Sequence, residues 1–485
     1  MNRALRRISI AALVMFVLLL VNDNYLQGFQ SDRLRNEPGN ARAFAQQFQQ
    51  QRGDILTSDG SVIAASRAAG GIYKWQRYYP NGTLYAPVTG YDSIYGASGL
   101  ELAEDKLLSG SDPRLTVRRW VDMVSGKKPQ GASVVTTIHD KAQAAAYNAL
   151  KSTGMSGGVV ALNPQTGGII AMASDPTYDP NKYATFSGTQ LNAVDNAYRK
   201  DPSQPLLDRA INATYPPGST FKVVTSSAAF SSGKYSPQSL IDAPTNLTLP
   251  LTSTQLINFD NEACFNGKPP IIQAFTVSCN TAFANLGMQV GQNAIRNQAQ
   301  AFGMNDPNLK IPMPVSESSY PPGLNQPQTA MSAIGQFNDQ VTPLQEAMFS
   351  SAIANGGQLE SPYLVQQVKA PDLSTIESAS PQTLGQPVSS SVADQVKSMM
   401  GSVVSDPAGT AHNSAQIPGV QVYAKTGTAQ NGINNTGLDD AVFTCFAQYG
   451  SQQIAVGVVV KGGGQGADAA APVAVQVIKA YLGLS

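Results

Sequence analysis

Histidine, cysteine and charged residues are all scarce in this chain of 485 residues. Its two histidines, His139 and His412, nearly exclude a histidine-dependent catalytic triad or a multi-histidine metal site. Three cysteines exclude a disulfide-dense scaffold and a zinc site with four thiolates. The net charge of zero argues against nucleic-acid binding, which usually needs a basic excess. Any nucleophilic chemistry must therefore use serine, threonine, lysine or a carboxylate.

The amino end carries an apolar segment, and no second stretch of membrane-spanning length follows it. Three arginines precede an uncharged run from Ile8 to Val21, which would rise only about 21 Å as a helix. A hydrocarbon core is roughly 30 Å thick, so this length alone suits a cleaved signal peptide. The polar residues that follow do not form a cleavage site. We predict a single-pass anchor over residues 8–29, with residues 1–7 cytoplasmic and the rest outside. A cleaved signal peptide and a buried core helix are the alternatives.

Residues 30–150 have the pattern of an extended module of mixed strands and helices. Asp59-Gly60 lies between two short apolar runs, which is the signal for a tight hairpin. Residues 134–138 predict a strand, and the amphipathic pattern at 140–150 predicts a helix.

Residues 151–485 have the pattern of an α+β domain. Its expected elements are strands at 158–162 and 168–172, helical blocks at 219–300 and 326–355, strands at 420–424, 441–448 and 454–461, and a final helix at 471–482. Residues 236–262 and 358–392 are rich in proline, serine and threonine and are predicted to be loops. This order implies an antiparallel sheet with helices packed on it.

A serine and a lysine one helical turn apart form the first candidate site. Two prolines and a glycine precede Ser219, and they can lead the chain into a helix but cannot lie inside one. Ser219 then lies at a helix start and Lys222 on the same face one turn later. A serine hydroxyl needs a base, and a lysine is a base only where burial or a nearby cation keeps it neutral. A bare pattern of this kind is more often a helix cap beside a solvated lysine.

A lysine at the end of a strand pattern forms the second candidate site. In Lys425-Thr426-Gly427-Thr428 the lysine and hydroxyls can bind a carboxylate, and the glycine leaves room for a substrate against the backbone. A second cation there would also lower the pKa of Lys222. Alone, this pattern is more often an edge strand with a protective lysine.

The third candidate, Ser278-Cys279-Asn280, lies between helical patterns. Its hydroxyl and amide could relay a proton and hold a peptide, but the pattern alone occurs by chance in most chains of this length.

The three patterns occur in the order S-x-x-K, S-x-N and K-T-G, each in its expected context of helix start, interhelical loop and strand. Together they resemble the penicillin-recognising serine acyltransferases, and the chain is identified as a member of the class B penicillin-binding proteins, which are peptidoglycan D,D-transpeptidases. Its short length is similar to that of the short members of this family. Further similar segments lie at 52–55, 96–101, 175–181, 342–345 and 354–357. The resemblance implies a serine β-lactamase-like transpeptidase domain at 151–485, preceded by a non-catalytic dimerisation or pedestal module at 30–150.

The resemblance also implies a role for each candidate side chain. Ser219 attacks the carbonyl between two terminal D-alanines and forms an acyl-enzyme, while Lys222 takes its proton. Ser278 helps to pass that proton to the leaving D-alanine, Asn280 binds a substrate amide, and Lys425 supports the proton network.

The substrate-binding part of the site follows from the same resemblance. Thr426 and Thr428 bind the terminal carboxylate beside Gly427, and the backbone N–H groups of Ser219 and Thr428 form the oxyanion hole. No metal and no organic cofactor are expected.

The expected partners are peptidoglycan stem peptides, lipid-linked precursor strands, covalently bound β-lactams, and membrane proteins of cell division or elongation, including a glycosyltransferase. No nucleic acid is expected. A D,D-carboxypeptidase or β-lactamase, in which water resolves the acyl-enzyme, is an alternative, as is a non-catalytic penicillin-binding scaffold or sensor. The lack of an E-x-x-L-N-like segment, which would supply a deacylating glutamate, favours the transpeptidase.

The middle residue of the S-x-N pattern is Cys279, where serine or aspartate is common in relatives. In an oxidising compartment Cys279 could form a disulfide with Cys264 and so tether this loop. Two free, buried thiols are the alternative. Cys445 is expected to be a buried, small apolar residue in a strand.

Overall fold

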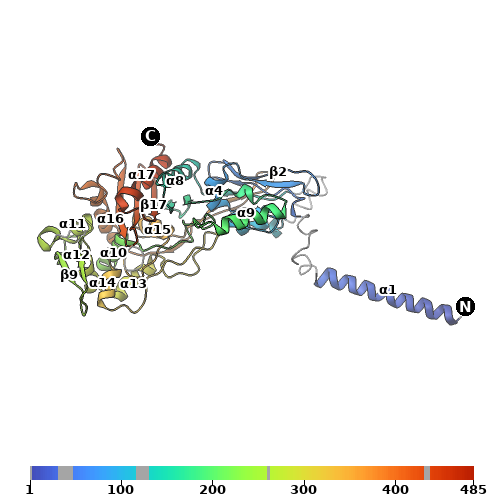
Figure 1. Ribbon diagram of the computed structural model, residues 1–485, viewed down its shortest axis with the longest axis horizontal. Coiled ribbons are helices and arrows are strands. Elements are labelled where there is room, and N and C mark those ends of the chain that lie inside the picture. The colour runs from blue at the N-terminus through green and yellow to red at the C-terminus, as the bar shows by residue number, and fades with distance from the viewer. Residues whose placement is uncertain (1–2, 31–46, 116–129, 259–262, 431–436, 485) are drawn as a thin grey trace.

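The computed structural model describes residues 3–30, 47–115, 130–258, 263–430 and 437–484. Helix α1 (Arg3–Phe29) lies at one end of the picture (Figure 1). The segment Leu5–Gln27 has a mean hydropathy of 2.0, and none of its most apolar window is buried inside the described chain. Its length corresponds to about 35 Å of helix, enough to cross a hydrocarbon core of roughly 30 Å. This exposure disagrees with the alternative of a buried core helix.

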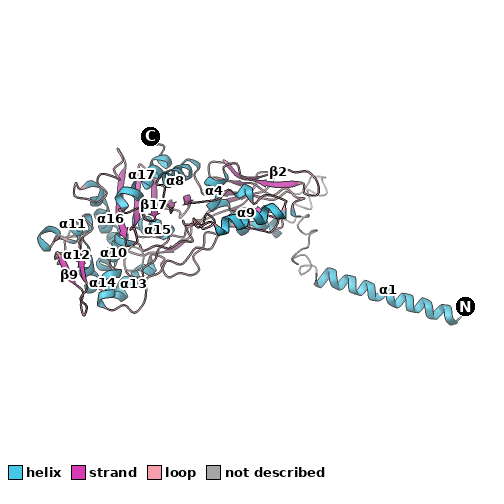
Figure 2. Cartoon of the chain, viewed as in Figure 1, coloured by secondary structure: helices cyan, strands magenta, loops and turns pink. Residues whose placement is uncertain are grey.

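A five-stranded antiparallel sheet forms the centre of the C-terminal domain, in the order β15-β16-β17-β7-β8 (Figure 2). Strand β17 pairs with β7, for example through Val458 and Val159. The last strand of the C-terminal domain therefore lies beside its first strand. The predicted α+β architecture is confirmed. The strands are β7 (Gly157–Leu162), β8 (Ile169–Asp175), β15 (Gln421–Ala429), β16 (Asp440–Tyr449) and β17 (Gln452–Val460).

Helices cover both faces of this sheet. A Cβ added to Gly157 would lie 3.1 Å from Leu150 of α8, whereas one added to Gly457 would lie 2.3 Å from the carbonyl oxygen of Pro343 in α15. Gly157 pairs with Val460, so both residues face the same side of the sheet. Gly457 lies three residues before Val460 on β17, and because side chains alternate along a strand, Gly457 faces the opposite side. The α-helices between residues 140 and 484, not all of which lie on this sheet, are α8 (Asp140–Ser152), α9 (Gly188–Lys200), α10 (Lys222–Ser231), α11 (Ile271–Thr276), α12 (Asn280–Val290), α13 (Gln292–Ala301), α14 (Gln326–Ser332), α15 (Pro343–Ala354), α16 (Ser390–Ser405) and α17 (Ala471–Leu482).

A second sheet, of six strands in the order β13-β12-β6-β1-β2-β3, organises the N-terminal module. Its first hairpin confirms the turn predicted at Asp59-Gly60, where Gly60 has a φ of 89°. The module contains β1 (Ile55–Leu56), β2 (Val62–Ala68), β3 (Trp75–Tyr78), α4 (Gly82–Thr89), β4 (Asp92–Ser93), β5 (Gly96–Ala97), α5 (Gly99–Ala103), α6 (Asp105–Leu108) and β6 (Ser133–Thr136).

Two strands of this second sheet, β12 (Val365–Lys369) and β13 (Thr375–Ser378), come from far along the chain. The loop predicted at 358–392 was therefore wrong over these strands. The loop predicted at 236–262 was likewise wrong where a hairpin forms. These short strands are largely half-exposed and polar, so they carry no apolar periodicity that a sequence pattern could detect. The other strands in these two segments are β9 (Asn246–Thr248), β10 (Gln255–Ile257), β11 (Leu359–Glu360) and β14 (Thr383–Gly385).

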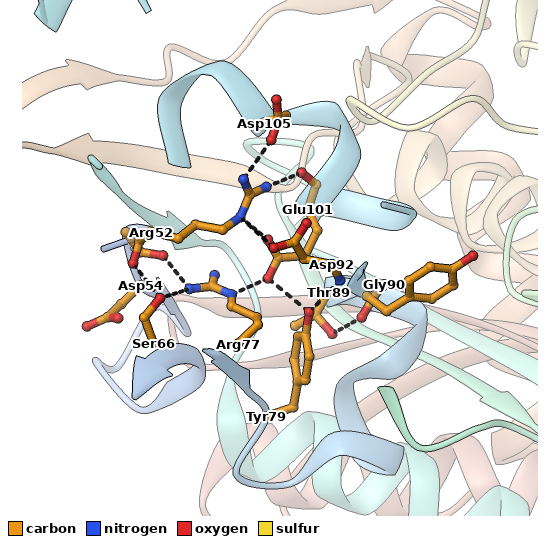
Figure 3. A network of polar contacts seen from close by, with 12 residues as sticks. Arg52, Asp54, Ser66, Arg77, Tyr79, Thr89, Gly90, Asp92, Glu101 and Asp105 are labelled. Atoms are coloured by element: carbon orange, nitrogen blue, oxygen red, sulfur yellow. Dashed lines mark hydrogen bonds and ion pairs between the residues drawn. The ribbon is translucent and has the colours of Figure 1, made fainter. Parts of the chain in front are cut away.

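A buried cluster of opposite charges ties the N-terminal module together (Figure 3). The carboxylate of Glu101, which is fully buried, accepts hydrogen bonds from Arg52 Nε at 2.6 Å and from Arg77 Nε at 2.5 Å. Arg52 also pairs with Asp105 at 2.6 Å, and the hydroxyl of Tyr79 donates to Glu101 at 3.2 Å. Burial alone would raise the pKa of Glu101, but Arg77 and Arg52 lower it overall. The cluster joins two segments that the sequence singled out.

We expect Glu101→Gln to lower the free energy of unfolding by about 3–5 kcal/mol, because two buried guanidinium groups lose their shared anion. Denaturant unfolding of the detergent-solubilised full chain, followed by circular dichroism, measures this loss. Asp105→Asn is the matched control: it changes the half-exposed partner of Arg52 and should cost less than about 1 kcal/mol. Equal losses in the two variants would contradict the central place of Glu101.

Candidate active site

A cleft of about 830 Å³ lies beside β15, the edge strand of the C-terminal sheet. Residues from three distant segments line it: Ser219 from the start of α10, Ser278 and Asn280 from the turn between α11 and α12, and Thr426 and Thr428 from β15. The structure thus brings together the three patterns that the sequence singled out.

Ser219 lies in a short 3-10 turn, η3 (Gly218–Phe221), that leads into α10. Gly218 has a φ of 56°, a conformation that favours glycine, and its N–H donates to the carbonyl of Gly335 at 2.9 Å. A Cβ added to Gly335 would lie 2.0 Å from the carbonyl oxygen of Gly218. This close approach of two backbones holds the turn, and Ser219 remains half-buried on the wall of the cleft.

Lys222, at the start of α10, extends into a closed polar pocket. Its Nζ lies 2.7 Å from the carbonyl oxygen of Ser278, 3.2 Å from Ser278 Oγ and 2.8 Å from Asn280 Oδ1. The side chain is fully buried, and Nζ lies 5.4 Å from the ring centre of Phe283. Burial, and then the positive charge of Lys425, lower the pKa of Lys222 well below its usual range. A lysine can act as a base only in an environment of this kind.

Lys425 reaches the same serine from the sheet. Its Nζ lies 2.9 Å from Ser278 Oγ and 2.9 Å from the carbonyl oxygen of Thr426. The side chain is fully buried, and this burial lowers the pKa of Lys425 to about 7. The hydroxyl of Ser278 therefore bridges two buried amines.

Strand β15 presents part of its backbone to the cleft. The carbonyl of Thr428 accepts a hydrogen bond from Gln336 Nε2 at 3.3 Å, so it points away from the neighbouring strand β16. The N–H and C=O of one strand residue point to the same side, so the N–H of Thr428 also faces the cleft. A Cβ added to Gly427 would lie 2.8 Å from the carbonyl oxygen of Pro217. Glycine at this position lets β15 lie against the turn that carries Ser219.

The turn at Ser278 has a strained backbone. Its φ of 60° is costly for a residue other than glycine, so the surroundings must hold it. Asn258 does so from the hairpin β9–β10, because its Oδ1 accepts hydrogen bonds from the N–H groups of Asn280 and Thr281, both at 3.0 Å. These bonds satisfy the first donors of α12, as an N-cap does.

A disulfide joins Cys264 to Cys279, inside the S-x-N pattern. It links the strained turn to the 3-10 helix at Cys264–Gly267. The third cysteine, Cys445, is a free thiol that is fully buried in β16, as expected for a small apolar residue.

Sequence reasoning missed three neighbours of the site: Asn258, Thr410 and Gln336. Thr410 shares a hydrogen bond of 2.6 Å with the hydroxyl of Thr426. Each of the three acts on a residue distant in sequence, so no local spacing marks it. Of the three, Asn258 alone lay in a segment that the sequence marked, residues 236–262, and that segment was predicted to be a loop instead of a hairpin.

The arrangement can support acyl transfer through a serine. The hydroxyl-bearing residue Ser219 shares a cleft with Thr428 and Ser278, and two amines with lowered pKa values contact the hydroxyl of Ser278. Within the described ranges, no three histidine, cysteine, aspartate or glutamate side chains gather where they could hold a metal ion.

Comparison with protein families and relatives identifies both modules. The transpeptidase domain of penicillin-binding proteins matches residues 157–479, and the dimerisation domain of penicillin-binding protein A matches residues 52–134. Peptidoglycan D,D-transpeptidase PbpA of Mycolicibacterium smegmatis is 41% identical, with 99% of each chain covered. The PbpA of Mycobacterium tuberculosis is 39% identical with the same coverage.

Solved structures are similar over most of the chain. The imipenem acyl-enzyme complex of penicillin-binding protein A from Mycobacterium tuberculosis has a TM-score of 0.85 and is 38% identical, covering 90% of this chain and 100% of that one. The penicillin G acyl-enzyme complex has a TM-score of 0.84 at 38% identity, covering 89% and 100%. With a family match over most of its length and relatives aligned from end to end, the chain belongs to the class B penicillin-binding proteins.

Proposed function

We propose that the protein is a peptidoglycan D,D-transpeptidase that joins stem peptides through an acyl-enzyme on Ser219. The observation that carries this proposal is the hydroxyl of Ser278, which lies 3.2 Å from one buried lysine and 2.9 Å from the other beside the cleft that Ser219 lines. A serine nucleophile needs an adjacent base, and a neutral amine can serve as one. The relatives named as peptidoglycan D,D-transpeptidases, and the β-lactam acyl-enzymes of one of them, support the same reaction.

In the first half-reaction Ser219 Oγ bonds to the carbonyl carbon of the penultimate D-alanine, while neutral Lys222 takes the hydroxyl proton. The C–N bond to the terminal D-alanine then breaks, and the leaving nitrogen receives a proton through Ser278. One proton leaves the serine and one arrives on the amine. The products are an ester on Ser219 and free D-alanine.

In the second half-reaction the amine of a neighbouring stem peptide attacks the ester carbon. The C–O bond to Ser219 breaks, and a proton of the amine returns to the serine through Lys222. A β-lactam would acylate Ser219 by the first half-reaction alone, with its ring nitrogen in the place of the leaving amine.

Backbone and side-chain donors would stabilise two negative charges, the oxyanion of the transition state and the terminal carboxylate of the substrate. We assign the oxyanion hole to the N–H groups of Ser219 and Thr428, which fits a helix start and a strand N–H that faces the cleft. Asn280 uses its Oδ1 for Lys222, which leaves its NH₂ group for a substrate carbonyl. The hydroxyls of Thr426 and Thr428 would bind the terminal carboxylate.

The same proposal includes the placement of the chain. Residues 8–29 would cross the membrane, with residues 1–7 in the cytoplasm and the transpeptidase domain, 151–485, outside. Residues 30–150, completed by β12 and β13, would be the dimerisation or pedestal module. Lipid-linked precursor strands and membrane proteins of cell division or elongation, including a glycosyltransferase, are the partners proposed for it. The apolar helix and the match to a dimerisation domain support this arrangement.

We expect Ser219→Ala to abolish covalent labelling by penicillin while the protein keeps its unfolding temperature, because the variant lacks only the attacking oxygen. Intact-mass measurement of the detergent-solubilised full chain after incubation with penicillin gives the adduct stoichiometry. Ser231→Ala, at the exposed end of the same helix, is the matched control and should label fully. Stoichiometric labelling of Ser219→Ala would reject Ser219 as the nucleophile. An adduct that the wild-type protein loses rapidly to water would favour a hydrolase.

We expect Lys222→Ala to slow acylation by about 10²–10⁴-fold, the usual contribution of a general base, and further through lost positioning. Stopped-flow measurement with a fluorescent penicillin gives the rate constant. Lys234→Ala removes an exposed lysine just beyond α10 and should leave the rate unchanged. An unaltered rate in Lys222→Ala would remove this amine from the mechanism.

The acylation rate should pass through a maximum with pH. It falls on the acid side as Lys222 gains a proton, and on the alkaline side as Lys425, with a pKa of about 7, loses its charge. The two charges disfavour each other, and we assign the first loss of a proton to Lys222, whose pKa burial and Lys425 together lower well below its usual range. In Lys425→Met, the alkaline limb near pH 7 should disappear. Its persistence in that variant would assign the limb to another group.

A further inference from the structure

A buried glutamate lies beside the turn that carries the nucleophile. Glu346, in α15, has no solvent exposure, and its Oε1 lies 2.8 Å from the hydroxyl oxygen of Thr220, the residue after Ser219. Its other carboxyl oxygen, Oε2, has no hydrogen-bond partner among the described residues. None of the acyl-transfer steps proposed above uses this group.

The contacts of Thr220 fit a protonated Glu346. The hydroxyl oxygen of Thr220 also lies 2.8 Å from the carbonyl oxygen of Pro217. A threonine hydroxyl has one hydrogen, and a carbonyl oxygen can only accept. One arrangement gives each contact a hydrogen of its own: Thr220 donates to Pro217, and Glu346 donates to Thr220. A carboxyl group can do this only in its neutral, protonated form.

The surroundings of Glu346 agree with a neutral acid. In the described chain, no cation pairs with its carboxyl group, since Lys222 and Lys425 both bond to Ser278. Burial raises the pKa of Glu346 to about 8. The titratable side chains on the elements around α15 are Lys222 on α10, Glu360 on β11, Asp394 and Lys397 on α16, Tyr423 and Lys425 on β15, and Asp440, Cys445 and Tyr449 on β16, and none makes a described contact with this carboxyl group.

The same residues also touch the sheet. The backbone carbonyl of Glu346 accepts a hydrogen bond from the hydroxyl of Thr444, in β16, at 2.5 Å. A Cβ added to Gly427 would lie 2.8 Å from the carbonyl oxygen of Pro217 and 3.1 Å from a methyl group of Thr220. Glu346 therefore connects α15 to β16 and to the turn of the nucleophile, and that turn packs against the edge strand β15.

We propose that Glu346 is a positioning residue that acts as a neutral acid: its hydroxyl donates to Thr220, whose hydroxyl donates to the Pro217 carbonyl, and this chain holds Ser219 at its place beside β15. The inference rests on the proposed role of Ser219 as the nucleophile. A shift of about 1 Å in a reacting group can cost on the order of 10²-fold in rate, so this support has a measurable effect.

The test separates acylation from binding in the detergent-solubilised full chain, with a fluorescent penicillin as the probe. Glu346→Gln keeps a donor for Thr220 and should acylate within about twofold of the wild-type rate at pH 7. Glu346→Leu removes the donor and should lower the limiting acylation rate constant at least tenfold, with little change in the dissociation constant of the non-covalent complex. Thr220→Val should lower the limiting acylation rate constant as much as Glu346→Leu does, whereas Thr220→Ser should retain it. The double variant that combines Glu346→Leu with Thr220→Val should be no slower than either single variant.

The pH profile supplies a readout that packing alone would not move. Ionisation of Glu346 breaks its donation, so the wild-type rate should fall relative to that of Glu346→Gln as pH rises through about 8. A constant ratio up to pH 9.5, or a Thr220→Val variant that acylates at the wild-type rate, would overturn the inference. If Glu346→Leu fails to fold, Thr220→Val and the pH ratio decide. A wild-type protein without an adduct on Ser219 would instead refute the proposed function itself.

Discussion

Two amines in one buried space cannot both keep a positive charge, and the chemistry of the cleft depends on this constraint. Lys222 and Lys425 approach the same hydroxyl, that of Ser278, in an environment closed to solvent. Burial penalises each charge, and the charge on Lys425 further lowers the pKa of Lys222. Lys222, which follows the turn of the candidate nucleophile, is the amine proposed to lose its proton first. In this proposal a chain with only two histidines obtains a neutral base.

Because the amines act through one hydroxyl, the position of Ser278 has to be set from several directions. Its backbone lies in the left-handed region, which persists only where surrounding contacts over-determine it. Asn258 caps the helix that follows, a disulfide at Cys279 ties the turn to a neighbouring loop, and Lys425 contacts the hydroxyl from the sheet. These contacts come from separate parts of the chain, so the geometry of the site depends on the packing of the whole domain.

The sequence predicted the features that show as local patterns, which are closely spaced site residues and continuously buried strands. Ser219 and Lys222 lie one turn apart on a helix, and the long strands of the C-terminal sheet are apolar on both faces, so both are visible as local patterns. Strands β12 and β13 are short and largely half-exposed or exposed, and β12 pairs with β6, more than two hundred residues earlier. Asn258 and Glu346 were missed for a related reason: their partners are remote in sequence, and a glutamate in a helical segment is usually solvated.

The buried acid and the buried amines together give the turn of Ser219 an unusual electrostatic setting. Glu346, taken as a neutral acid, and Lys222, taken as a neutral amine, leave Lys425 as the charged member of these three buried groups. A negative charge that develops on a substrate oxygen then meets no repulsion from Glu346. In the proposed mechanism, its attraction to the N–H groups of Ser219 and Thr428 is screened less in a partly buried site than in water. The two neutral states would therefore serve acylation in separate ways, because Lys222 becomes able to accept a proton and Glu346 does not oppose the oxyanion.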